Sequence, residues 1–223
     1  MHDQFYWAGE MALSDESMMK LAQSAAQATV SCFSRKSGVE PALELSKAVN
    51  FQLGTAFVRF QERNVDIQCQ AGCKFCCHLR VAAFPYEAAA IVSYIDSELP
   101  QEQALELRKR IAEKAALISG MTEEQHFTTN IECAFLYEGK CAVYPVRPSS
   151  CAGYHSLSRE RCEFAYNHPT DLETVKPDSE ELKQFHAAID EGIKQALMAL
   201  EFDAEKGELH TVMAKTLNAR PAP

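Results

Sequence analysis

Eight of this chain's nine cysteines fall into two groups, and this grouping constrains the fold more than any other feature of the sequence. The first group is Cys69, Cys73, Cys76 and Cys77, and the second is Cys133, Cys141, Cys151 and Cys162. Thiols at this density need either disulfide bonds or bound metal. An odd number of cysteines fits a disulfide framework poorly, so the pattern favours a metal-thiolate site held by a helical scaffold.

Composition and charge narrow the class of protein. The chain has 223 residues, 47% hydrophobic and 24% charged, a balance typical of a soluble globular domain. Its formal net charge of −9 repels phosphate backbones, so we expect no nucleic acid partner. Neither a secretory signal nor an apolar run of about 20 residues is visible, so we expect a cytoplasmic protein with no membrane partner. In a reducing cytoplasm, clustered cysteines are more often metal ligands than disulfides.

Apolar residues recur at spacings of three and four along much of the chain, which is typical of amphipathic helices. Together with caps and prolines, they predict helices over about residues 14–38, 41–65, 85–95, 101–118, 179–200 and 209–217, with a further helical turn at 122–125. Residues 79–84 are expected to be a brief strand or extended chain. From Cys133 to His168 no helical period is visible, so a compact irregular region is expected there.

These expectations combine into one fold class. The sequence predicts a mainly α protein, a single domain over residues 1–223, in which two cysteine-rich loops converge on a metal site. The cysteine-cluster core spans about residues 69–162, and the flanking helices lie within residues 14–66 and 179–217. Cys32 lies on the apolar stripe of the first helix, so we interpret it as a buried thiol rather than a ligand.

Thiolates bind zinc in fours, and they also hold iron–sulfur clusters in fours. Eight cysteines would therefore suit two four-thiolate sites, or one cluster and one zinc ion. Cys76 and Cys77 are neighbours and cannot easily reach one site from extended chain, so one of them is expected to serve a second ion, to bridge or to stay free.

Other residues beside the cysteines suggest supporting roles. Pro145 and Pro148 stiffen the approach to Cys151. Arg147 and Lys74 could offset the charge of a thiolate site, and the alternative for Arg147 is an ordinary surface ion pair. His78 and His155 adjoin the cysteine loops. Their alternative roles are as ligands, as proton donors or as simple hydrogen-bonding residues.

The order of these segments resembles a known family. The first group reads C-x3-C-x2-C-C, and it is followed by Cys133-Ala134-Phe135-Leu136, Gly139-Lys140-Cys141-Ala142-Val143-Tyr144, Arg147-Pro148 and Cys151. This arrangement resembles the YkgJ-type cysteine-cluster family, a zinc- or iron-chelating domain with a C-x(2,3)-C-x-x-C-C signature. The resemblance covers about residues 69–155 and implies seven ligands, Cys69, Cys73, Cys76, Cys77, Cys133, Cys141 and Cys151. Cys162 suits an extended form of the signature, and Ala152 stands where family members often have Arg.

A related cysteine pattern occurs in a flagellin lysine methylase group that resembles iron–sulfur enzymes, so a 4Fe-4S cluster is an alternative to simple zinc or iron binding. Cys69, Cys73 and Cys76 also fit the cluster loop of radical S-adenosylmethionine enzymes. Those enzymes use a βα-repeat barrel, however, and this chain lacks the strand periodicity of one.

The leading hypothesis is a cytoplasmic protein that binds zinc or iron. The alternative is an iron–sulfur-dependent enzyme, such as a protein methyltransferase or a redox enzyme. A third hypothesis is metal storage or delivery to a protein partner. No motif for nucleophilic, phosphate or metalloprotease chemistry is present, so no catalytic residue is assigned.

Overall fold

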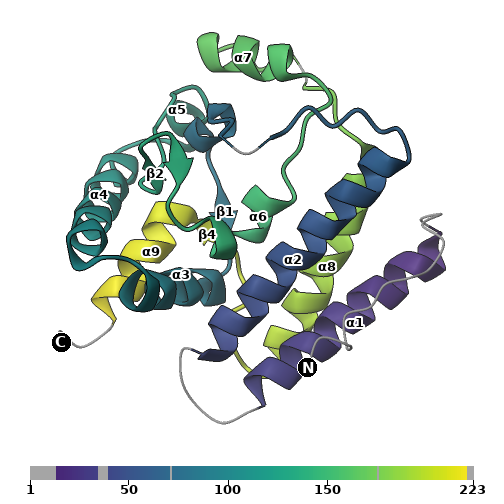
Figure 1. Ribbon diagram of the computed structural model, residues 1–223. Helices are drawn as coiled ribbons and strands as arrows, with labels where there is room; N and C mark the ends of the chain where they lie inside the picture. The colour runs from purple at the N-terminus through teal and green to yellow at the C-terminus, as the bar shows by residue number, and fades with distance from the viewer. Residues whose placement is uncertain (1–13, 35–39, 71, 175, 220–223) are drawn as a thin grey trace.

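The computed structural model describes residues 14–34, 40–70, 72–174 and 176–219, and it is mainly helical, as the sequence predicts. Figure 1 shows two groups of helices with shorter elements between and above them. One group consists of α1 (Asp15–Phe33), α2 (Glu40–Glu62) and α8 (Glu180–Ala199), and the other consists of α3 (Pro85–Glu98), α4 (Gln101–Ser119) and α9 (Leu209–Asn218). None of the described helices combines the length and the apolarity that crossing a bilayer requires.

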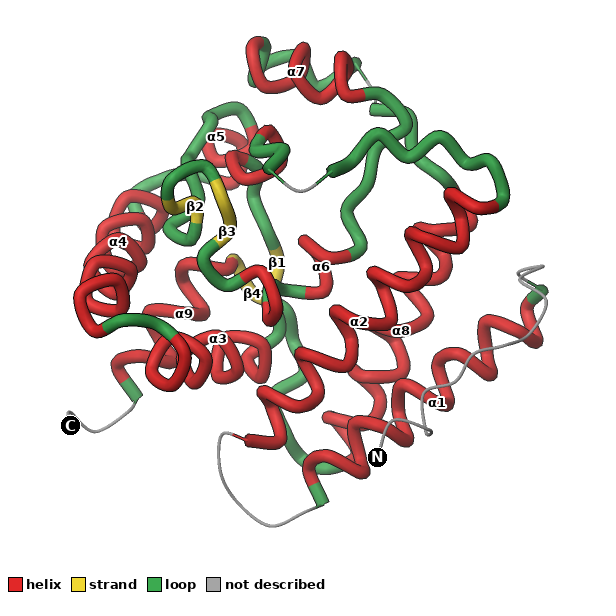
Figure 2. Tube along the Cα trace, in the orientation of Figure 1, coloured by secondary structure: helices red, strands yellow, loops and turns green. Residues whose placement is uncertain are grey.

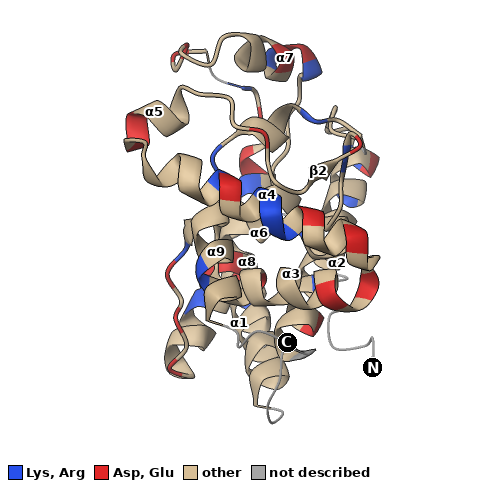
Figure 3. Ribbon diagram, turned by 90° about the vertical axis from the view of Figure 1, so that its left-hand side faces the viewer, with Lys and Arg blue, Asp and Glu red and all other residues tan. Residues whose placement is uncertain are grey.

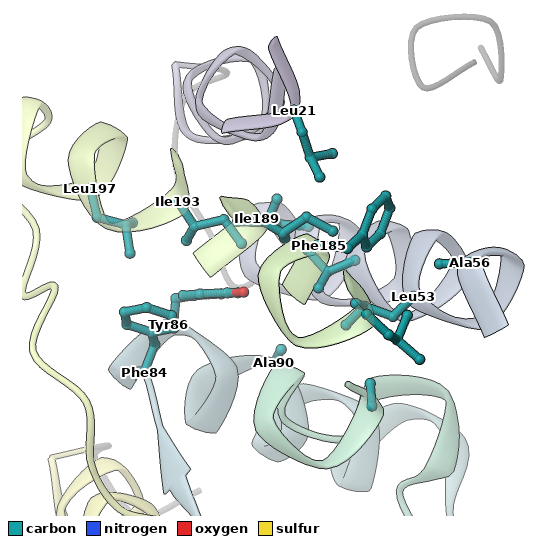
Figure 4. Close-up of a cluster of buried hydrophobic side chains, with 14 of the residues drawn as sticks. Leu21, Leu53, Ala56, Phe84, Tyr86, Ala90, Phe185, Ile189, Ile193 and Leu197 are labelled. Atoms are coloured by element: carbon teal, nitrogen blue, oxygen red, sulfur yellow. The ribbon is translucent and has the colours of Figure 1, made fainter. Parts of the chain in front are cut away.

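The first helical group is held together by apolar side chains from all three of its helices (Figure 4). The buried members include Leu21 of α1, Leu53 and Ala56 of α2, and Phe185, Ile189, Ile193 and Leu197 of α8. Gly192 lets α1 and α8 approach closely, because a Cβ atom there would lie 2.0 Å from the backbone oxygen of Ala22. Ser14 and Ser179 cap α1 and α8, since the side chain of each accepts a backbone N–H in the first turn, and both helices begin where the sequence predicts.

The second helical group encloses a second apolar cluster. Ile91 and Ile95 of α3, Leu107 and Ile111 of α4 and Met213 of α9 are at most 1% exposed. Helix α4 buries only part of its surface, and Figure 3 shows residues of both charges along it. The predicted helix over residues 101–118 is therefore confirmed as an amphipathic one.

Strands are short and connect the helical parts (Figure 2). Strand β1 (Ala82–Ala83) pairs antiparallel with β4 (Gly207–Glu208), with Ala82 opposite Glu208, which confirms the brief strand expected within residues 79–84. Strands β2 (Leu136–Tyr137) and β3 (Lys140–Cys141) form a hairpin. Its turn residues Glu138 and Gly139 both have positive φ, which is the conformation of the tight turns that join hairpin strands.

The remaining elements are short. They are the 3₁₀-helices η2 (Phe75–His78) and η3 (Tyr144–Val146) and the helices α5 (Glu123–Phe127), α6 (Ser149–Ala152) and α7 (Arg159–Asn167). Helix α5 confirms the predicted turn at 122–125, and Thr122 caps it. The end expected for the first helix at Gly38 lies outside the described residues.

The expectation of an irregular region from Cys133 to His168 was wrong in part, because α6 and α7 lie within it. Helix α7 has no buried residue, so its sequence carries no apolar period that could reveal it. The signals that it does carry are Ser158, which caps the helix, and Glu160 in its first turn.

Candidate metal centre

Both cysteine groups line a single cavity of about 690 Å³. The lining sulfur residues are Cys69, Cys73, Cys76, Cys77, Cys133, Cys141 and Cys151. All nine cysteines of the chain are free of disulfide bonds. We call this space the cysteine cavity. Cys162 does not line it, although its charge acts on Cys69, and Cys32 packs against the apolar cluster of the first helical group.

Backbone hydrogen bonds hold the two cysteine loops side by side. The N–H of Cys133 donates to the carbonyl oxygen of Cys77 at 2.8 Å, and that of Ile131 donates to His78 at 3.3 Å. At the other end, the N–H of Ser156 donates to the sulfur of Cys69 at 3.2 Å. The first loop is therefore fixed against both the beginning and the end of the second.

Cys76 and Cys77 both face the cavity because the chain here is a 3₁₀-helix rather than extended. Their side chains are hydrogen-bonded to each other, and this contact raises the pKa of Cys76. The expectation for this pair assumed extended chain, whereas the tight helical turn brings the two sulfurs together; which of the two would bind an ion stays a prediction.

The segment around Cys133 is anchored by helices far away in the sequence. Arg110 of α4 donates to the carbonyl oxygen of Leu136 at 2.8 Å. Nε2 of His210 in α9 accepts the N–H of Ala134 at 3.2 Å. Because Nε2 accepts, the ring proton lies on Nδ1, which donates to Glu208 at 2.9 Å. Neither Arg110 nor His210 has a sequence pattern that indicates this role.

Helix α6, which carries Cys151, rests on a buried polar network. The carboxylate of Glu87 is 1% exposed and accepts the N–H of Ser149 at 2.6 Å and that of Phe84 at 2.8 Å. The ammonium of Lys206 contacts the hydroxyl of Ser150 at 3.1 Å and also pairs with Asp190. These contacts fix the start of α6, and no local motif predicts them.

The stiff segment before α6 is held from α2. The side chain of Asn50 donates to the carbonyl oxygen of Arg147 at 2.8 Å, and the hydroxyl of Ser46 donates to that of Val146 at 3.3 Å. The approach to Cys151 is therefore fixed by α2 as well as by Pro145 and Pro148.

The two histidines beside the cysteine loops do not line the cavity. His78 makes a hydrogen bond through Nδ1 to the carbonyl oxygen of Lys74 at 3.1 Å. His155 uses both ring nitrogens, one toward the carbonyl oxygen of Gly153 at 3.1 Å and one to accept the N–H of Ser179 at 2.8 Å. Of the alternatives for these residues, hydrogen bonding is the one that the structure favours.

Burial and the guanidinium of Arg147 act in opposite directions on the pKa values of the cavity thiols. Burial raises the pKa of Cys133 to about 12, and it also raises the pKa values of Cys141 and Cys151. Arg147 lines the cavity, and its charge acts in the opposite direction on Cys141 and Cys151. Its guanidinium lies 4.1 Å from the ring centre of Tyr144, and its Nε atom is buried without a hydrogen-bond partner. These contacts favour the thiolate-supporting role of Arg147 over a surface ion pair, whereas Lys74 does not line the cavity.

The sulfur ligands suit a soft metal, but the cysteine side chains in the described part of the chain are not grouped closely enough to hold an ion. Thiolates are preferred ligands of zinc and of iron–sulfur clusters. Among the residues that the structure describes, however, no three His, Cys, Asp or Glu side chains are grouped as an ion would require. The sulfurs lie around the wall of the cavity and would have to move inward to share an ion.

Comparison with known proteins gives one finding. The family model described as "CxxCxxCC: Putative zinc- or iron-chelating domain" matches residues 68–184, slightly more than half of the chain. The match confirms the resemblance and extends beyond residue 155 to include Cys162. No curated protein and no solved structure matches the chain. The chain belongs to the CxxCxxCC family of zinc- or iron-chelating domains.

Proposed function

We propose that this protein binds zinc or iron through cysteine thiolates drawn from both loops of the cysteine cavity. The observation that carries the proposal is that seven of the eight grouped cysteines line one cavity, although 82 residues separate Cys69 from Cys151. The proposed ligands are Cys69, Cys73, Cys76, Cys77, Cys133, Cys141 and Cys151, with Cys162 close to Cys69 as a further candidate. Family membership supports a metal-binding role.

Binding must be coupled to loss of protons. Burial disfavours bare thiolates, so the buried cysteines are protonated at neutral pH in the metal-free protein. A bound cation and the guanidinium of Arg147 together would stabilise the negative sulfurs. We therefore expect metal binding to release protons and to draw the two loops inward around the ion.

The site has two alternative compositions. One is zinc or iron ions, each held by four thiolates, and the other is a 4Fe-4S cluster. The close contact of Cys76 and Cys77 supports a site in which both sulfurs bind one ion or two neighbouring ions. A reducing compartment such as the cytoplasm would suit either composition, since the cysteines must stay reduced to bind.

Metal analysis of protein isolated without oxygen tests the proposal directly. A colourless protein that contains zinc supports a zinc site, and a brown protein with a broad absorption band near ~400 nm supports an iron–sulfur cluster. Substitution of Cys151 or Cys133 by Ser should lower the metal content, whereas Cys32→Ser is the matched control because Cys32 lies in the first helical group. A folded protein without metal, in which the cavity cysteines react freely with a thiol reagent, would refute the proposal.

A further inference from the structure

The cysteine cavity is larger than metal ions require. Its volume of about 690 Å³ lies in the range of roughly 300–1,000 Å³ that is usual for pockets holding small molecules. A zinc ion lies only about 2.3 Å from each of its sulfur ligands, so a metal site leaves no room for other groups between its ligands. Apolar side chains, among them Phe57, Ile67, Phe135 and Leu209, line the same cavity. The wall of the cavity therefore offers apolar contacts for an organic molecule as well as sulfur ligands for a metal.

Gly54 marks an open part of this wall. It lies in the interior of α2 and lines the cavity, and a Cβ atom added there would meet no other atom within 4 Å. Glycine inside a helix costs about 1 kcal/mol relative to alanine. At Gly192 a neighbouring backbone explains the glycine, since a Cβ atom would lie 2.0 Å from the oxygen of Ala22. At Gly54 no neighbour in the described structure does so, and the helix surface is bare where it faces the cavity.

The carboxylates and the cations are unevenly distributed around the cavity. Among the described residues, no Asp or Glu lines the cavity, whereas Arg80, Lys140 and Arg147 do. Arg80 already pairs with Glu123 at 3.3 Å. Arg147 keeps a buried Nε atom without a hydrogen-bond partner. An occupant with a negative group would meet cations here and no opposing carboxylate.

The bare helix surface at Gly54 and the side chain of Arg147 line the same cavity. Asn50 precedes Gly54 by one helical turn, so the two lie on one face of α2. Asn50 donates to the carbonyl oxygen of Arg147 at 2.8 Å, which fixes Arg147 beside that face. The ring of Tyr144, whose centre lies 4.1 Å from the guanidinium, also lines the cavity.

We propose that the cysteine cavity binds a small organic anion, whose apolar body lies against Gly54 and Phe57 and whose carboxylate, sulfonate or phosphate group pairs with Arg147. The negative group would pair with the guanidinium where Arg147 lines the cavity. The apolar body would fill the space that the bare surface of α2 leaves, next to the sulfurs. This site depends on the walls of the cavity rather than on the metal, so the two proposals can fail separately.

The experiment uses the full-length protein as isolated and the fluorescent anion 8-anilinonaphthalene-1-sulfonate as the probe. Gly54→Leu should fill the space on α2, and we expect it to weaken binding of the probe at least about tenfold while the metal content is unchanged. The matched control is Val58→Leu, which enlarges an exposed residue of the same helix that does not line the cavity. Near-ultraviolet circular dichroism confirms that each variant is folded before it is titrated.

A second variant tests the negative group. Arg147→Gln should weaken binding of the anionic probe several-fold more than binding of the neutral dye Nile red. Equal loss for both dyes would overturn the assignment of an anion. Unchanged probe binding in Gly54→Leu, or loss of metal from that variant, would overturn the ligand site and would mean that the cavity closes around metal alone. Probe binding that depends on Gly54 in a protein without metal would support the ligand site and refute the metal proposal.

Discussion

Glu87 is the residue whose substitution most directly tests how Cys151 is held in place. Its carboxylate joins the start of α3 to the start of α6, because one oxygen accepts the N–H of Phe84 and the other accepts the N–H of Ser149. Glutamine has the same size but only one oxygen, so in Glu87→Gln one of the two N–H groups would face an NH₂ group. Ser149 is 0% exposed, so water cannot replace the lost acceptor there.

The expected magnitude follows from these contacts. A hydrogen bond to a charged group contributes about 1.5–3 kcal/mol, and a buried donor without a partner costs about 1–3 kcal/mol. These two figures are not added, because both count the loss of the same hydrogen bond. We therefore expect Glu87→Gln to lower the free energy of unfolding by about 2–3 kcal/mol. For a chain of this size, that corresponds to a fall in Tm of roughly 4–12 °C.

The assay is urea denaturation of the metal-free protein, followed by circular dichroism, with metal retention measured on the same samples. Because α6 carries Cys151, metal retention should fall along with stability. Glu98→Gln is the control, since Glu98 is an exposed glutamate of the same helix, and we expect it to change stability by less than about 0.5 kcal/mol. If Glu87→Gln matched Glu98→Gln in both measurements, the carboxylate would not hold α6, and the argument would be wrong.

Three further outcomes are expected. Burial raises the pKa of Cys133 from 9.0 to about 12, so this thiol ionises at lower pH in the unfolded chain than in the folded protein. The metal-free protein should therefore lose stability as pH rises from 9 to 12. Urea midpoints measured across this range should show a smaller loss in Cys133→Ser. Burial favours the protonated form of Glu208, but the hydrogen bonds that it accepts from His210 and from the backbone of Thr211 lower its pKa from 4.5 to about 2. Stability should therefore be lost as pH falls from 4.5 toward 2, by up to about 3 kcal/mol, and Glu208→Gln should show a smaller loss in acid titrations. Gly192→Ala places a Cβ atom 2.0 Å from the backbone oxygen of Ala22 and should cost about 1–3 kcal/mol or more in thermal melts, because α1 and α8 must separate; an unchanged Tm would mean that the two helices are not in close contact.

The helices that could be predicted are those whose buried face gives the sequence a helical period of apolar residues. In α8, the apolar residues Leu182, Phe185, Ile189 and Ile193 follow the helical period because they pack on α1 and α2. Helix α7 has no buried residue, so its sequence shows no such period. The hairpin at residues 136–141 was missed for a related reason, because two-residue strands are too short for an alternating pattern, and only the Glu138-Gly139 turn signals it.

The sulfur residues of the candidate site could be predicted, but the residues that hold them could not. Thiols gathered in sequence are unusual enough to be noticed without a structure. Glu87 lies 62 residues from Ser149, and His210 lies 76 residues from Ala134, and each of these long-range links is one hydrogen bond from a backbone N–H. Any residue with an acceptor could make such a bond, so only the folded chain identifies which one does. Cys162 shows the converse, because its place in the sequence suggests a ligand and the structure places it outside the cavity.

The division between the family segment and the rest of the chain separates the residues of the two sites proposed for the cavity. The matched segment, residues 68–184, contains all of the grouped cysteines and Arg147. Gly54 and Phe57 of α2 and Leu209 of α9 line the same cavity from outside that segment. Metal binding would thus be a property of the family segment, whereas the space for a ligand depends on helices that lie outside it. It follows that substitutions in α2 should alter what the cavity accepts without altering which metal it holds, and the comparison of Gly54→Leu with Cys151→Ser measures that separation.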